Sequence, residues 1–198
     1  MIKKGEWVLI LFNLLYIVAF TIYYVAKQNY EFMVYIGVLV LLFAVVFAIQ
    51  RRVKFPLPIL WMLSVWGLLH MLGGGVHLAD GTVLYRWIPI ELYQGIDSEF
   101  VLLKFDQILH FYIYFVMSFV LAHLVRNKMQ GMKPLYVGLF VALASMGLSV
   151  INELIEFGAV LFLGKTGVGG YYNTLLDLLF NTLGAVVGAW ASSLRTRH

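Results

Sequence analysis

The sequence predicts an all-α integral membrane protein, built as a bundle of six transmembrane helices with both termini in the cytoplasm. Of its 198 residues, 62% are hydrophobic and only 12% are charged, and the mean hydropathy is +0.89. A soluble domain is about 45–50% apolar and about 25% charged, so this chain has too little polar surface to coat a globule in water. The composition excludes a soluble enzyme and a disordered tail, and the absence of cysteine excludes disulfides and thiolate metal sites.

Six apolar stretches are long enough to cross a bilayer, which takes about 20 mostly apolar residues in a helix. The expected spans are residues 7–26, 32–49, 57–72, 105–125, 135–163 and 172–192. Pro56 and Pro58 suit the start of the third helix, and the three glycines at 73–75 predict its end. The fifth stretch is long, so we expect it to tilt, to bend near Gly147 or to stop before Leu163. We expect one domain, residues 1–198.

The basic residues predict the orientation, because cytoplasmic segments carry the excess of Lys and Arg. Ten of the 14 basic residues lie in the two terminal segments and in the second-to-third and fourth-to-fifth connections: Lys3, Lys4, Arg51, Arg52, Lys54, Arg126, Lys128, Lys133, Arg195 and Arg197. The other four, Lys27, Arg86, Lys104 and Lys165, lie in the opposite connections. Cytoplasmic termini and an extracytoplasmic loop at 73–104 follow. No basic cluster lies on a soluble surface, so we expect lipids and no nucleic acid as partners.

Several ionisable side chains lie in the last three spans, where their insertion into the bilayer costs free energy. An Asp near the centre of a span costs about 2.5–3.5 kcal/mol on insertion scales, so such residues indicate function. The outer halves of these spans hold four acids and one histidine: Asp106, His110, Glu153, Glu156 and Asp177. Asp106 and His110 are four residues apart and Glu153 and Glu156 three, so each pair projects from one helix face.

A polar stripe on the sixth span supports the same site. Asn173, Asp177 and Asn181 recur every fourth residue, and Gly184 and Gly188 nearly continue that face. A small-xxx-small pattern allows helices to approach closely. The stripe is therefore expected to face the bundle interior, and the Gly184/Gly188 face is a candidate for pairing two chains into a homodimer.

Carboxylates this close need bound protons or cations to offset their charge. Carboxylates and imidazole from facing helices bind metals in helical bundles, and such ligands suit Mg, Mn, Fe or Zn, with Ca possible from outside. We therefore predict that one or two divalent ions are bound by the five residues Asp106, His110, Glu153, Glu156 and Asp177. The alternative is a structural polar cluster that locks three helices together.

Several segments resemble a known family. Residues 105–111, 152–157, 170–181 and 184–185, together with 69–74, resemble the YjdF-type small polytopic inner-membrane proteins of bacteria, a family without an established activity. More distantly, the D-x-x-x-H-F helix, the acidic middle helix and the D-x-x-x-N-x-x-G helix resemble the VanZ-like proteins linked to teicoplanin resistance. The matching positions are Asp106, His110, Glu153, Asp177, Asn181 and Gly184. The resemblance implies a bacterial cytoplasmic (inner) membrane and supports a site at these residues.

Three functions remain open from the sequence. A metal-dependent enzyme would act on lipid or lipid-linked cell-envelope substrates, with Glu156 or Glu153 as the catalytic base. The residues expected to contact its substrate are His70, Arg86, Lys104, Asn173 and Asn181. The second function is an ion- or proton-coupled transporter, or a tolerance protein that binds an amphiphile or antibiotic. The third is a structural or assembly factor.

Overall fold

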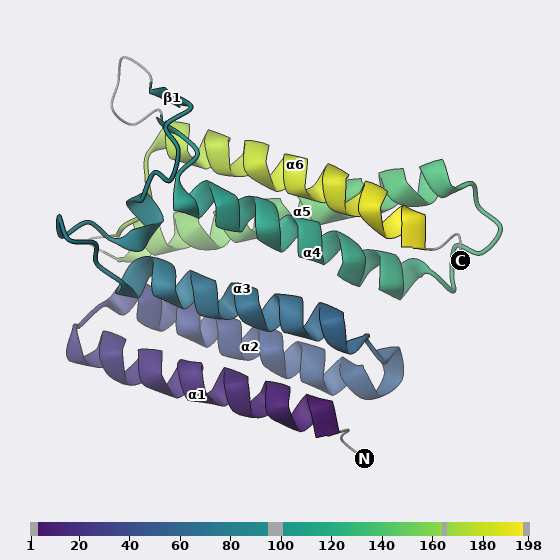
Figure 1. Cartoon of the computed structure of the whole chain (residues 1–198), viewed down its shortest axis with the longest axis horizontal. Helices are drawn as coiled ribbons and strands as arrows, with labels where there is room; N and C mark the ends of the chain where they lie inside the picture. The colour runs from purple at the N-terminus through teal and green to yellow at the C-terminus, as the bar shows by residue number, and fades with distance from the viewer. Residues whose placement is uncertain (1–3, 95–100, 164–165, 196–198) are drawn as a thin grey trace. The chain divides into compact units, whose positions relative to one another are not determined.

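The computed structural model describes residues 4–94, 101–163 and 166–195 and is mainly helical (Figure 1). Its six long helices are α1 (Lys4–Ala26), α2 (Tyr30–Val53), α3 (Leu57–Gly75), α4 (Phe105–Val125), α5 (Pro134–Phe162) and α6 (Tyr171–Arg195). All six are long and apolar enough to cross a membrane, which confirms the predicted number. The fifth helix ends at Phe162, which agrees with the expectation that it stops before Leu163. Lys3, Lys165 and Arg197, used above to predict orientation, lie outside the described residues.

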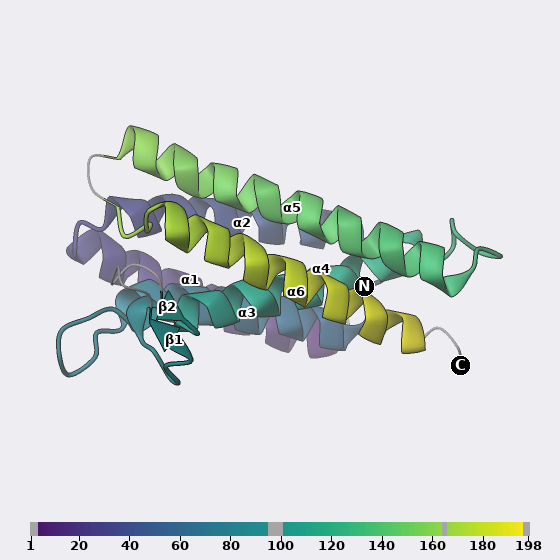
Figure 2. The same cartoon turned by 90° about the horizontal axis from the view of Figure 1, so that it is seen from above.

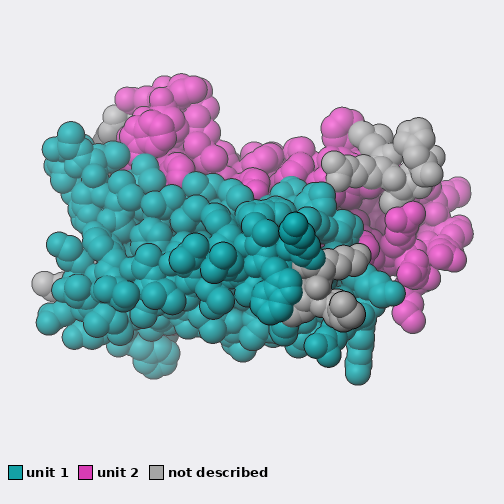
Figure 3. Space-filling model, turned by 60° about the horizontal axis from the view of Figure 1, so that its bottom comes forward, with its two compact units in different colours: residues 1–85, 159–167 teal, residues 86–158, 168–198 magenta. Residues whose placement is uncertain are grey.

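The chain divides into two compact units, coloured separately in Figure 3. Unit 1 comprises residues 1–85 and 159–167, and therefore holds α1, α2 and α3. Unit 2 comprises residues 86–158 and 168–198, and holds α4, α6 and most of α5. Each unit is described by itself below.

In unit 1, α1, α2 and α3 run side by side (Figures 1 and 2), and polar side chains of α1 reach α3. The Asn13 amide donates to the Ser64 hydroxyl at 2.8 Å near the middle of the helices. Farther along α1, the Tyr23 hydroxyl donates to the carbonyl oxygen of Gly75 at 2.8 Å. That carbonyl lies in the last turn of α3, where no helical N–H follows to pair with it. The tyrosine therefore ties α1 to the end of α3.

The three glycines at 73–75 form the last turn of the third helix instead of following it, so the helix ends three residues later than the predicted span. Helix α3 continues through Gly75, and Val76 is the first extended residue. The reason is packing: a Cβ at Gly74 would lie 1.9 Å from the Phe32 ring, and one at Gly73 would lie 2.6 Å from the Tyr85 ring. The glycines are thus sites where aromatic rings press against the helix backbone.

Unit 2 is organised by a close contact between α4 and α6. A Cβ added at Gly184 would lie 2.1 Å from the Phe111 carbonyl oxygen, and one at Gly188 would lie 2.5 Å from that of Phe115. The Ser118 hydroxyl donates across the same contact to the carbonyl oxygen of Ala185 at 3.0 Å. The Gly184/Gly188 face, expected to pair two chains, is thus used to pack α6 on α4 of the same chain.

The loop before α4 contains a short two-stranded sheet, and its backbone is hydrogen-bonded to the first turn of the helix. Strands β1 (Tyr93–Gln94) and β2 (Val101–Leu102) pair antiparallel, and a short 3-10 helix spans Leu84–Arg86. The fully buried Gln107 side chain accepts from the N–H groups of Leu103 and Lys104 and donates to the Val101 carbonyl oxygen at 2.9 Å. Gln107 therefore satisfies backbone groups of the segment that leads into the helix and fixes that segment to its first turn.

We predict that Gly184→Ala weakens unit 2. The new methyl group would meet a backbone carbonyl, which has little room to move, and overpacking of this kind costs about 1–3 kcal/mol. The matched control is Gly147→Ala on α5, where nothing lies within 4 Å of an added Cβ, and where alanine favours the helix by about 0.5–1 kcal/mol. Reversible unfolding in detergent micelles measures both changes. Equal stabilities for the two variants would contradict the close contact.

Candidate metal centre

Helix α4 supplies Asp106 and His110, which lie one turn apart on the same face. The His110 side chain is 8% exposed, and its Nε2 lies 3.6 Å from Asp106 Oδ1. The spacing of four residues that predicted this pair therefore brings the imidazole and the carboxylate together. His110 is the centre of the arrangement, because acids from the neighbouring helices approach the same ring.

Helix α5 contributes two acids to the imidazole. Glu153 Oε1 lies 3.6 Å from His110 Nδ1, and Glu156 Oε1 lies 3.8 Å from His110 Nε2. The two side chains are 10% and 20% exposed. The Asn152 amide donates to Glu156 Oε1 at 2.9 Å and so orients this carboxylate. Asn152 was not among the predicted site residues, although its spacing of four residues from Glu156 could have indicated it.

Helix α6 contributes Asn181, whose fully buried amide joins the acids to the histidine. Its Nδ2 donates to Glu153 Oε1 at 3.1 Å, and its Oδ1 lies 2.9 Å from His110 Nδ1. Because a carboxylate only accepts, the amide must direct its NH₂ group to Glu153 and its oxygen to the ring. His110 Nδ1 then carries the proton, and in the neutral ring Nε2 presents a lone pair to Asp106 and Glu156.

Asp177 on α6 is the most deeply buried acid of the cluster, with no exposed surface. Asn173 donates to Asp177 Oδ2 at 2.5 Å. Two residues of the polar stripe predicted from the sequence are therefore hydrogen-bonded to each other along α6. The other oxygen, Oδ1, is buried and has no hydrogen-bond partner. A buried acceptor without a partner costs about 1–3 kcal/mol, or more when charged, so this atom calls for a ligand.

The charges of the cluster do not balance among the described residues. Four carboxylates surround one imidazole, which could offset at most one negative charge. In the part of the chain that the structure describes, no lysine or arginine forms an ion pair with these acids. Removal of one partner from a buried ionic group leaves an uncompensated charge that costs several kcal/mol. The remaining negative charge therefore needs bound protons or a bound cation.

The spacing of the donor atoms suits a cation. Asp106, His110 and Asp177 each offer a ligand atom within 4.8 Å of the others, and so do His110, Glu153 and Glu156. Two ligands on opposite sides of one ion, at bond lengths of about 2.1–2.4 Å, lie about 4.2–4.8 Å apart. Small side-chain movements would close either group around an ion.

Three residues expected to contact a substrate have other surroundings. His70 lies in unit 1, where the Trp66 ring stacks on it with centroids 5.2 Å apart and the Tyr85 hydroxyl contacts its Nδ1. Arg86 is exposed in the loop of unit 2, and Lys104 precedes α4 with a half-buried side chain. Neither forms an ion pair with the cluster within the described residues.

One buried acid lies outside the cluster. Glu31, in the first turn of α2, is 9% exposed. It accepts from the Gly167 N–H at 2.5 Å and from the Tyr35 hydroxyl at 3.3 Å. Unlike Asp177, this carboxylate has hydrogen-bond partners on both oxygens, so it serves below as the matched control for the acids of the cluster.

The fold and the site define a polytopic helical membrane protein with a buried carboxylate–histidine cluster. The chain belongs to the family described as "Predicted membrane protein (DUF2238)", whose family model matches residues 8–198. This is the YjdF-type family, so that resemblance is confirmed. No curated protein and no solved structure matches the chain.

We predict that Asn181→Leu destabilises the protein by about 2 kcal/mol or more, because it leaves the His110 N–H and a Glu153 oxygen without this partner, each at about 1–3 kcal/mol. The neighbouring control is Thr182→Val, since the Thr182 hydroxyl makes no hydrogen bond within the described residues. Unfolding in mixed detergent micelles measures the difference. If both variants lose the same stability, the amide does not join the two groups.

Proposed function

We propose that the cluster binds a divalent metal ion and that the protein uses this ion to hydrolyse a lipid or lipid-linked substrate of the cell envelope. The observation that carries the proposal is the Asp177 carboxylate. It has no exposed surface and keeps one oxygen without a partner. It also belongs to a set of residues whose ligand atoms lie within 4.8 Å of one another. Bound protons would neutralise these acids one at a time. A metal ion would instead be bound by ligand atoms of two helices at once.

The residues divide into ligands and a base. Asp106, His110 Nε2 and Asp177 hold the ion, and Asn181 fixes the ring tautomer that leaves Nε2 free to bind it. A divalent ion polarises a phosphoryl oxygen or activates water. Glu156, oriented by Asn152, lies on the Nε2 side of the ring, where it would accept the proton of the water that attacks the substrate. Glu153 accepts from the Asn181 amide and so keeps the amide oxygen directed at His110 Nδ1.

The surroundings of the cluster favour an amphiphilic substrate. The helices that carry it expose large apolar side chains along their outer faces, among them Leu154 and Phe157 beside the acids and Leu175 and Leu179 on α6. A substrate with an acyl or isoprenyl chain would enter from the bilayer, with its polar group at the level of the acids. Arg86 and Lys104 precede α4 and are our choice for pairing with a phosphate on that substrate.

We infer that both termini lie in the cytoplasm and that the cluster lies in the outer half of a bacterial inner membrane. Alternation of six spans brings the start of α4, the end of α5 and the start of α6 to the same membrane side, which is where the cluster residues lie along these helices. The excess of basic residues on the opposite side supports its assignment to the cytoplasm.

The topology can be tested by cysteine labelling. Because the chain has no cysteine, only the introduced residue reacts. We expect Asp80→Cys, in the exposed loop after α3, to react with a membrane-impermeant maleimide on intact spheroplasts. Lys128→Cys, in the exposed connection between α4 and α5, should react only after permeabilisation. The reverse pattern would place the cluster in the inner half and overturn the inference.

Metal binding by the cluster can be tested by measuring the metal content of protein purified without chelators, using mass spectrometry. We expect about one divalent ion per wild-type chain, and its loss in Asp106→Asn and Asp177→Asn, because each removes a charged ligand. Glu31→Gln is the matched control, since it changes a buried carboxylate outside the cluster and should keep the ion. Glu156→Gln should also keep the ion but lower the hydrolysis of a lipid diphosphate in micelles by about 100-fold or more.

Two outcomes would contradict parts of this proposal. A wild-type chain that binds no ion, even after Mn, Zn or Ca is added, would overturn the metal centre and favour carboxylates that carry protons, as in a proton-coupled transporter. Metal retention in all four variants would show that the ion lies elsewhere. Metal binding without hydrolysis would remove the enzyme and leave the metal site.

A further inference from the structure

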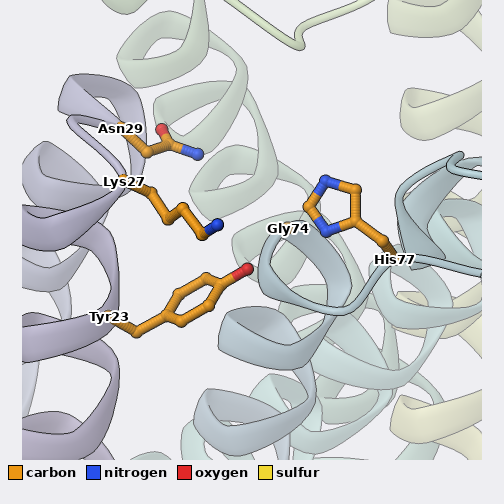
Figure 4. Close-up of a pocket in the computed structure, with 5 residues that line it drawn as sticks. All are labelled: Tyr23, Lys27, Asn29, Gly74 and His77. Atoms are coloured by element: carbon orange, nitrogen blue, oxygen red, sulfur yellow. The ribbon is translucent and has the colours of Figure 1, made fainter.

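Unit 1 contains a second polar site, which the proposed function does not use. A pocket of about 380 Å³ opens near the ends of α1 and α3 and is lined by Tyr23, Lys27, Asn29, Gly74 and His77. In Figure 4 the Lys27 amine, the Tyr23 hydroxyl and the Asn29 amide face this space from one side, and the His77 ring faces it from the other. The pocket volume lies within the range of small-molecule sites, about 300–1,000 Å³.

Lys27, Asn29 and His77 each keep a nitrogen atom that no hydrogen bond within the described residues uses. Lys27 forms no ion pair within the described residues. The Asn29 oxygen accepts the Phe32 N–H at 3.1 Å as the cap of α2, which leaves its NH₂ group free to donate into the pocket. His77 Nδ1 lies 3.3 Å from the Gly75 carbonyl oxygen, so its other ring nitrogen is available to a ligand.

His77 is placed by a tight turn rather than by a loose loop. The Leu84 N–H donates to the Val76 carbonyl oxygen at 2.9 Å, and Leu78 and Thr82 pair at 2.8 Å, so the chain folds back on itself on both sides of His77. Gly81 closes the turn with a φ of +84°, which glycine adopts without strain. The site is therefore preorganised, which reduces the entropy lost on binding.

Carboxylates close in sequence to the pocket are engaged elsewhere. Glu31 accepts from Gly167 and Tyr35, as described above. Asp80 accepts from both the hydroxyl and the N–H of Thr82, at 2.7 and 2.9 Å, and these hydrogen bonds lower the pKa of its carboxyl below the ordinary value. Among the described residues no acid lines the pocket, and the Lys27 ammonium group is its one full charge. The electrostatics favour an anion.

We propose that this pocket binds a phosphate group, the chemistry shared by phospholipid headgroups and free inorganic phosphate. Lys27 supplies the charge, and the Asn29 amide donates to a phosphate oxygen. Because Nδ1–H of His77 donates to Gly75, its Nε2 accepts from a hydroxyl group of the ligand, either a P–OH or a headgroup hydroxyl. Lys27 directly follows α1 and His77 comes two residues after α3, so the pocket lies where apolar helices end and lipid headgroups begin. This inference does not depend on the metal centre.

The experiment compares Lys27→Gln and His77→Gln with wild type in detergent. Native mass spectrometry counts retained phosphatidylglycerol, with diacylglycerol of the same chains as the lipid without phosphate, and titration calorimetry measures inorganic phosphate. We expect Lys27→Gln to weaken phosphate-group binding about tenfold, the size of one charge-assisted hydrogen bond. The control is Lys54→Gln, an exposed lysine that directly follows another span, α2.

Each outcome decides the proposal. Loss of phosphatidylglycerol alone identifies a headgroup site, and loss of inorganic phosphate binding identifies a site for the free ion; both support it. Equal retention of phosphatidylglycerol by wild type, Lys27→Gln and Lys54→Gln, with no phosphate binding, would overturn it. So would equal retention of diacylglycerol and phosphatidylglycerol. Unfolding measurements on the same samples ensure that a loss of binding reflects the pocket, and His77→Gln provides an independent variant.

Discussion

At Gly184 and Gly188 the backbone of α6 lies against carbonyl groups of α4, with no side chain between them. This contact sets the separation of the two helix axes, and this separation determines whether polar side chains of the two helices can contact each other. Asp177 and Asn181 lie on α6, toward its start, and Asp106 and His110 lie on α4, also toward its start. A wider separation would leave the Asn181 amide out of reach of the imidazole. The cluster thus depends on residues that have no functional groups of their own.

The bilayer explains why the cluster is so fully hydrogen-bonded. An unpaired polar group in hydrocarbon costs several kcal/mol, since no water replaces a missing partner. Three asparagines, Asn152, Asn173 and Asn181, each donate an amide hydrogen to one of the acids. Against this background, Asp177 Oδ1 is the one fully buried side-chain polar atom without a partner among the described residues, and this exception points to a ligand. Structural roles alone explain the asparagines but do not explain that oxygen.

The sequence predicted the helices and the membership of the cluster because both depend on local regularities. Span length follows from the bilayer thickness, and the pairs Asp106–His110 and Glu153–Glu156 follow from the helical repeat. What it did not predict depends on contacts between distant segments. The glycines at 73–75 read as a helix end, because nothing in the local sequence shows that Phe32 and Tyr85 pack on them. Similarly, the Gly184/Gly188 pattern indicates close packing but does not identify the partner helix.

The dependence of the cluster on glycine packing has a genetic consequence. Gly184 and Gly188 lie seven and eleven residues beyond Asp177 along α6, which is about 10 and 16 Å along a helix axis. An unbiased screen for inactive alleles should therefore recover these glycines alongside the acids, and the two groups of alleles should be hard to separate by phenotype. They would differ in their biochemical defect. Loss of a glycine places a Cβ against a backbone carbonyl of α4 and weakens the packing of the two helices, whereas loss of a ligand leaves that packing in place.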